Sequence, residues 1–185
     1  RAISKIIWAV YRFKYRRLLK ATYQFIDKQK EKINCERKSV FVFANGPSMK
    51  DIDLNKVDAL CKGGVFDLIA INSYLSKSAD TAKPTYAIFA DNVHFNNAAG
   101  QYKKDIEKCI ELDIPYFAPA KYVSESSGLR YAYCSLCNID ASNTSNILKP
   151  AGYYGVTAFF ALSLAKMLGY QNIYVCGFDN SYFFF

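Results

Sequence analysis

From Ser39 onwards, hydrophobic positions fall in short runs that alternate with helical patterns. Five runs have the length of strands: residues 40–44, 66–71, 86–90, 115–118 and 173–176. Three segments between them have helical spacing: residues 53–62, 97–112 and 155–168. Because residues 40–44 are apolar throughout, this run indicates a strand covered on both faces. It predicts an α/β fold with a Rossmann-like open, mostly parallel sheet and helices on both faces.

One long stretch departs from this alternation. Residues 121–152 are polar and rich in Ser, Asn and Gly, so we expect an excursion or loop there.

A second pattern precedes the alternating region. Apolar residues at helical spacing, with aromatic and basic residues between them, predict a basic amphipathic helix that continues to Lys32. Residues 1–38 hold twelve Lys and Arg against three Asp and Glu, whereas residues 39–185 hold twelve against thirteen. The chain therefore divides into a basic helical arm, 1–38, and a nearly neutral domain, 39–185, which we expect to be truncated at its C-terminus.

Two interpretations of the arm stay open. It packs on its own domain or on a sister subunit in a homo-oligomer, or residues 1–32 lie on an anionic membrane surface. Nucleic-acid binding is not expected, because no recognised module follows the arm.

The cysteines point to a reducing compartment. Six are scattered along the chain, and only Cys134 and Cys137 have C-x-x-C spacing, without a second pair to complete a zinc site. We expect reduced thiols in a cytoplasmic protein, which would be peripheral on the inner membrane face if the arm binds lipid.

Polar residues follow four of the predicted strands: Asn45-Gly46-Pro47-Ser48, Asn72, Asp91 and Gly177-Phe178-Asp179. Because parallel strands end at one edge of a sheet, we expect these residues to share a ligand site. Gly46 lets the backbone approach a ligand and Pro47 fixes φ. Ser48 or Asp51 is expected to cap the next helix, whose N-terminus suits a phosphate. A tight turn without a ligand would also explain this motif.

Two common nucleotide motifs are missing from this turn. No Gly-Lys-Ser/Thr follows it, and it is not G-x-G-x-x-G, so neither a Walker loop nor a nicotinamide cofactor is indicated.

Three segments carry a family resemblance: "FANGPSMKDIDL", "YAIFADNVHF" and "YGVTAFFALSLAKMLGYQNIYVCGFDNSY". The first resembles the opening motif of the bacterial sialyltransferase-like proteins, G-N-G-P-S-L-K-x-I-D, and the last resembles their closing helix, strand and G-x-D unit. The same segments are similar to the uncharacterised proteins grouped with the archaeal 6-hydroxymethylpterin diphosphokinase. The likeness covers about residues 40–182.

The resemblance implies a glycosyltransferase of surface-glycan biosynthesis. Its donor would be a CMP-activated nonulosonic acid or a related nucleotide sugar, its acceptor a glycan, and it would need no metal or other cofactor. Asn45, Gly46 and Ser48 would lie by the donor's phosphate, and Asn72 would hydrogen-bond the donor.

The chain departs from the family pattern at two places. Asp91 stands where the family has Asn, and its carboxylate would repel a phosphate. Tyr154 replaces the family's Ser before Gly155 and Val156, although Thr157 supplies a hydroxyl nearby, and Gly155–Thr157 is a second candidate anion site. Asp179 would bind a ribose or acceptor hydroxyl, or cap a turn.

The general base is not identified within the motifs. In the sialyltransferases a His past the G-x-D strand has this role, so we expect it beyond Phe185, and His94 is the candidate within the chain. Two alternatives remain: an ATP-dependent, magnesium-requiring diphosphokinase, whose aspartate-rich metal segment is reduced here to Asp91, and a non-catalytic nucleotide- or glycan-binding module.

Overall fold

In the computed structural model, the described residues are 2–36, 38–91, 95, 100–124, 129–136, 146–150 and 157–179. They form one six-stranded sheet in which every pairing is parallel. The strands are β1 (Ser39–Phe43), β2 (Phe66–Ile71), β3 (Tyr86–Ile88), β4 (Tyr116–Pro119), β5 (Arg130–Tyr133) and β6 (Ile173–Cys176). The predicted α/β, Rossmann-like class is confirmed.

The order of the strands reverses once. It runs β5-β4-β3-β2-β1-β6, so the chain adds strands on one side of β1 up to β5 and then crosses to pair β6 on the other side. The switch point of the sheet therefore lies between β1 and β6. In open α/β sheets, ligands bind beyond the strand ends at such a point.

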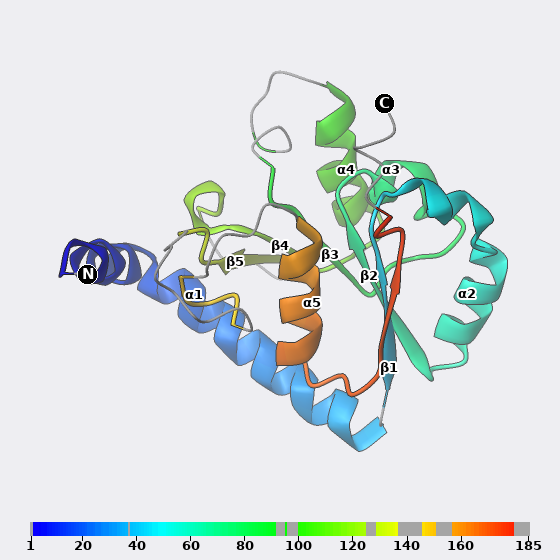
Figure 1. Cartoon of the computed structure of the whole chain (residues 1–185), viewed down its shortest axis with the longest axis horizontal. Coiled ribbons are helices and arrows are strands. Elements are labelled where there is room, and N and C mark those ends of the chain that lie inside the picture. Colours follow the sequence, from blue (N-terminus) through cyan, green and yellow to red (C-terminus); the bar gives the residue numbers. More distant parts are fainter. Residues whose placement is uncertain are drawn as a thin grey trace.

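Helices cover both faces of the sheet (Figure 1). One face carries α1 (Ala2–Glu36) and α5 (Thr157–Met167), and the other carries α2 (Leu54–Lys62), α3 (Tyr74–Ser78) and α4 (Gly100–Glu111). Side chains of β1 point alternately to the two faces of the sheet and join the hydrophobic core on each. Val40 and Val42 pack toward α5, whereas Phe43 packs toward α2 and α3. This two-sided burial explains why the strand is apolar throughout.

One strand and one α-helix of the described residues were not predicted. β5 lies within the stretch that we expected to be an excursion or loop, so that expectation is wrong for residues 130–133. The strand is only four residues long, and one of its partners, the side of α1, is remote in sequence. The five-residue helix α3 was missed because it is shorter than any periodic signal.

The arm is a single helix of 35 residues, four residues longer at its end than predicted. Its second half packs on the domain, where Leu19, Ile26 and Ile33 are buried. The Thr22 hydroxyl accepts a hydrogen bond from the Ala132 amide at 2.9 Å and lies 2.8 Å from the Ala132 carbonyl. For this half of the arm, the interpretation of packing on its own domain is confirmed.

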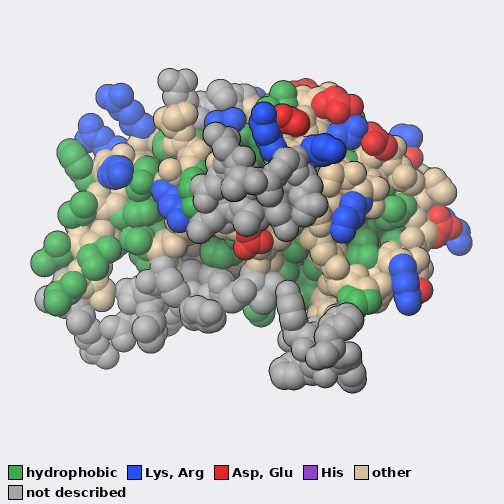
Figure 2. All heavy atoms as spheres, turned by 90° about the horizontal axis from the view of Figure 1, so that it is seen from above, with side chains coloured by type: hydrophobic (Ala, Val, Ile, Leu, Met, Phe, Trp, Pro, Cys, Tyr) green, Lys and Arg blue, Asp and Glu red, His purple; other side chains and the backbone are tan. Residues whose placement is uncertain are grey.

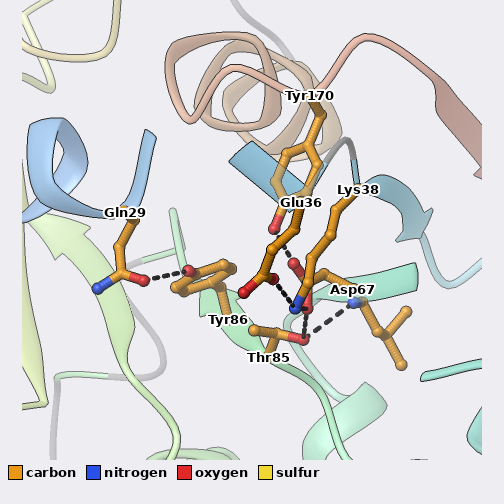
Figure 3. Close-up of polar contacts among 8 residues, drawn as sticks. Gln29, Glu36, Lys38, Asp67, Thr85, Tyr86 and Tyr170 are labelled. Carbon is orange, nitrogen blue, oxygen red and sulfur yellow. Dashed lines mark hydrogen bonds and ion pairs between the residues drawn. The ribbon is translucent and has the colours of Figure 1, made fainter. Parts of the chain in front are cut away.

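A polar network holds together the edge at which the strands begin. Figure 3 shows Asp67 of β2 among Lys38, Thr85 and Tyr170, which precede β1, β3 and β6 respectively. The Tyr170 hydroxyl donates to Asp67 at 2.6 Å, and burial together with the Asp67 charge raises the pKa of Tyr170. Partial burial opposes charge on Lys38, but its contacts with Glu36 and Asp67 outweigh this and raise the pKa of Lys38. The network ties the end of α1 to the sheet, away from the predicted ligand site.

Candidate functional site

The predicted site residues that the structure describes lie along the carboxyl edge of the sheet, the edge at which the strands end, which is at the top in Figure 1. A chain of contacts joins those that the structure describes. It runs from Asp179 through Ser48 and the turn after β1 to the end of β2, and from Asn72 to Asp91 and Thr157. Five chain segments thus meet at this edge.

The turn after β1 stays paired to the end of β6. The Ala44 amide donates to the Cys176 carbonyl and the Gly46 amide to the Gly177 carbonyl, both at 2.9 Å. A Cβ at Gly46 would lie 2.5 Å from the Gly177 carbonyl oxygen and 2.6 Å from Asp179 Oδ1. Glycine at position 46 therefore has a structural reason independent of any ligand, since it lets two strand ends approach closely.

Ser48 and Asp179 form the polar contact at the switch point. The Ser48 amide donates to Asp179 Oδ2 at 2.9 Å, and the Ser48 hydroxyl donates to Asp179 Oδ1. These two hydrogen bonds lower the pKa of Asp179. Both donors of Ser48 are thus already used by a carboxylate, so a phosphate would have to displace Asp179 to reach them.

The expected cap of the next helix is corrected by the structure. Pro47–Asp51 forms a short 3-10 helix, η1, and α2 begins later, at Leu54. Asp53, rather than Ser48 or Asp51, caps α2, because its carboxylate accepts from the amides of Asn55 and Lys56 at 3.1 and 3.2 Å. The carboxylate thereby occupies the N-terminus of α2, where we had expected a phosphate.

Asn72 organises the middle of the edge. Its φ of 47° lies in the left-handed region, which Asn adopts more readily than most residues. Its Nδ2 lies 3.2 Å from Asp91 Oδ2 and 3.4 Å from the Thr157 hydroxyl. The carboxylate accepts only, so this amide orientation is the consistent one. Asn72 Oδ1 is buried and has no hydrogen-bond partner among the described residues.

The remaining predicted residues are placed as follows. Asn45 is exposed, and its Nδ2 lies 3.4 Å from the Ile71 carbonyl. This contact bridges the ends of β1 and β2. Pro47 is exposed at the start of η1. Thr157 is buried at the start of α5. His94, Gly155 and Val156 lie outside the described residues.

Sequence reasoning missed two residues at this edge. Met49 packs beside Gly177, where a Cβ would lie 2.5 Å from Met49 Cγ and φ is 71°, so glycine is required there too. Tyr133, at the end of β5, donates from its hydroxyl to the Phe89 carbonyl at 3.1 Å. Burial raises the pKa of Tyr133, and the nearby Asp91 charge raises it further. Tyr133 stands in no motif, and Met49 lies within the quoted turn motif at an apolar position that nothing marked as part of the site.

Within the described part of the chain, no group of three or more His, Cys, Asp or Glu side chains is placed to hold a metal ion. A hollow of about 280 Å³ lies between α1 and α5, lined by Tyr23, Ile26, Asp27, Lys30, Lys166 and Met167. Because Met167 ends α5, the hollow is at the opposite end of that helix from Thr157 and the carboxyl edge.

Comparison with known proteins gives no relative. No family model, no curated protein and no solved structure matches the chain.

Proposed function

We propose that the protein binds a nucleotide sugar at the carboxyl edge and acts as a glycosyltransferase of the sialyltransferase type, with a CMP-activated nonulosonic acid or a related sugar as donor. The observation that carries the proposal is the meeting of Asn45, Asn72 and Asp179 at one edge of a parallel sheet, beside its switch point. The motif resemblance concerns these same residues.

The charge of the edge favours a donor with few phosphates. Asp91 and Asp179 both present carboxylates there, and neither forms a hydrogen bond with a Lys or Arg of the described residues. Each phosphate charge of a ligand is repelled by both carboxylates, so a nucleoside diphosphate or triphosphate is disfavoured. A CMP-activated sugar carries one phosphodiester charge between nucleoside and sugar, fewer phosphate charges than a UDP-sugar or ATP, and the carboxylate of a nonulosonic acid adds one charge on the sugar.

The polar atoms that remain open suit hydroxyl and amino groups. Asn72 Oδ1 is a buried acceptor without a donor among the described residues. Burying an unsatisfied acceptor costs about 1–3 kcal/mol, so a ligand hydroxyl or amino group that donated to it would recover that cost. We assign this atom to the donor substrate, in keeping with the role that the resemblance gives Asn72.

The reaction would be a displacement at the anomeric carbon. The bond from that carbon to the acceptor oxygen forms, the bond to the phosphate oxygen breaks, and CMP leaves with the electron pair. The acceptor hydroxyl gives its proton to a general base, for which His94 is the candidate within this chain. Asp179 is assigned to a ribose or acceptor hydroxyl, because its oxygens accept hydrogen bonds and do not donate them when ionised.

Nucleotide titration tests the proposal. CMP should bind the wild-type protein in calorimetry, and Asn45→Ala should weaken CMP binding about tenfold, as expected for one hydrogen bond to a charged group. The melting temperature should change little, because the contact of Asn45 with the Ile71 carbonyl is long, 3.4 Å. Asn34→Ala is the matched control, since Asn34 is exposed on the last turns of α1 near the opposite edge.

The other outcomes separate the alternatives. Binding of ATP that depends on magnesium, without binding of CMP, would favour a diphosphokinase. Absence of binding to CMP, UDP, GDP and ATP would favour a non-catalytic module and reject the proposal. A large loss of stability in Asn45→Ala with unchanged affinity for CMP would mean that the turn is only architectural.

A further inference from the structure

The first turns of α1 carry an apolar stripe that nothing in the described structure covers. Ile3, Ile6, Ile7, Val10 and Phe13 recur at helical spacing. Their side chains are between 52% and 73% exposed. Five large apolar side chains on one face of a helix form a contiguous patch rather than scattered surface residues, and such patches mark interaction sites.

The exposed stripe is separate from the face by which α1 packs on its domain. The packed face begins with the half-buried Tyr11 and Tyr15 and continues through Leu19, Thr22 and Ile26. At 100° per residue, the centre of the stripe lies well over 90° around the helix from that face. The helix therefore has two apolar faces, one that packs on the domain and one that no described residue covers.

The surroundings of the exposed stripe are strongly basic. Residues 1–26 contain seven Lys and Arg and no Asp or Glu, and Asp27 is the first acidic residue of the chain. Among the cations next to the stripe, Lys14 and Arg17 are exposed on the turn that follows it. Figure 2 shows hydrophobic and basic side chains gathered at the end of the molecule that holds the first turns of α1, with the visible acidic side chains toward the centre and the other end.

We propose that residues 3–17 of α1 dock on an anionic lipid surface, with the exposed stripe entering the boundary between headgroups and acyl chains. An apolar face bordered by Lys and Arg is the composition of helices that lie in the membrane interface. Basic residues near such a surface add an attraction that decays within a Debye length. A second copy of the arm is a poorer partner, because it brings seven more cations and no acidic residue within its first 26 positions.

The structure narrows the region that we expected to contact lipid. Leu19, Ile26 and Ile33 are buried in the fold, so residues 18–36 are held by the domain and the docking segment ends before them. None of the helices in the described part of the chain is long and apolar enough to cross a bilayer.

Vesicle co-sedimentation of the full chain tests the proposal. The protein should bind vesicles of phosphatidylcholine mixed with phosphatidylglycerol, and bind weakly or not at all to vesicles of phosphatidylcholine alone. The double variant Ile6→Gln with Val10→Gln should weaken binding about tenfold or more, because burial of one aliphatic side chain changes a partition constant by roughly that factor. Added salt should weaken the binding of the wild-type protein.

The matched control is Leu60→Gln with Val65→Gln. It removes two exposed aliphatic side chains in α2 and the segment before β2, and it should bind vesicles as the wild type does. Equal loss of binding in both double variants would overturn the proposal. So would a wild-type dimer in sedimentation that Ile6→Gln with Val10→Gln dissociates while vesicle binding is absent, because the stripe would then serve self-association.

Discussion

At the residue scale, Gly46 is a glycine whose backbone dihedral angles do not themselves require glycine. Its φ of −68° and ψ of 159° are open to any residue. What excludes a side chain is the Gly177 carbonyl at 2.5 Å from the Cβ position, a backbone atom that cannot rotate away. We therefore predict that Gly46→Ala lowers the free energy of unfolding by about 2–3 kcal/mol through overpacking, measured by urea denaturation.

Gly63→Ala is the matched control for this prediction. Gly63 has nearly the same φ, −67°, but a Cβ there would meet its nearest neighbours at 3.4 Å. It should be close to neutral or slightly stabilising, because alanine restricts the unfolded chain. If Gly46→Ala were as mild as Gly63→Ala, the close pairing of the β1 and β6 ends would not be rigid in solution.

Asp179 gives a pH-dependent prediction at the same scale. Hydrogen bonds from Ser48 lower the pKa of Asp179 below its ordinary value of 3.8. Because the folded pKa is the lower one, the contact contributes fully to stability above pH 3.8 and is lost as the pH falls through the folded pKa. An NMR titration should show the Ser48 amide shifting at a midpoint below 3.8.

The variant Ser48→Ala tests the cause of that shift. It removes the hydroxyl donor and keeps the backbone donor, so the midpoint should rise toward 3.8 without reaching it. A midpoint that Ser48→Ala leaves unchanged would mean that the hydroxyl does not hold the carboxylate in solution.

Residue-level partnerships were the least predictable part of the site. The motif around Asn45 marked the turn correctly, but nothing local indicated that Asp179, 131 residues away from Ser48, would take its amide. Likewise, the left-handed backbone of Asn72 is a property of the turn between β2 and α3, and α3 itself was not visible in the sequence. Residue identity indicates which polar groups are available, whereas the fold decides which of them meet.

At the element scale, the strands with the strongest apolar signal were predicted most accurately. β1, β2 and β6 each lie within a residue or two of their predicted bounds because continuous apolar runs between turn residues are unambiguous. β5 gave no such signal, since four residues with two partly exposed positions do not form a run. Its place at the end of the sheet is stabilised from outside, by pairing with β4 and by the Thr22 hydroxyl.

The contact between Thr22 and Ala132 protects the edge strand β5. The backbone of Ala132 would otherwise present an unpaired amide and carbonyl at the side of the sheet, a template for pairing with another chain. Thr22 satisfies the amide and approaches the carbonyl, while Phe25 stacks on Tyr131 with ring centroids 3.9 Å apart. The second half of the arm is therefore an integral element of the fold rather than an appendage, which composition alone did not reveal.

At the scale of the whole molecule, the sequence predicted the fold class but not the strand order. Alternating strands and helices required a parallel sheet covered on both faces, and the structure has one. Which strand follows which across the sheet depends on crossovers that leave no local pattern, so the switch point between β1 and β6 emerged only from the structure. That point gives physical support to placing a ligand near Asn45 and Asp179.

The division of α1 into a free and a packed part leads to a prediction about the whole chain. Removal of residues 1–10 deletes most of the exposed stripe but keeps Tyr11, whose hydroxyl accepts from the Ser135 amide, and should change the free energy of unfolding by no more than about 1 kcal/mol. Removal of residues 1–26 also deletes Leu19, Thr22 and Ile26. Two buried aliphatic side chains are worth about 2–5 kcal/mol each, so that loss approaches the entire stability of a typical domain. Thermal unfolding followed by circular dichroism should show a cooperative transition for the shorter deletion and none, or one at much lower temperature, for the longer. A protein that folds equally well without residues 1–26 would mean that the arm rests on the domain without stabilising it.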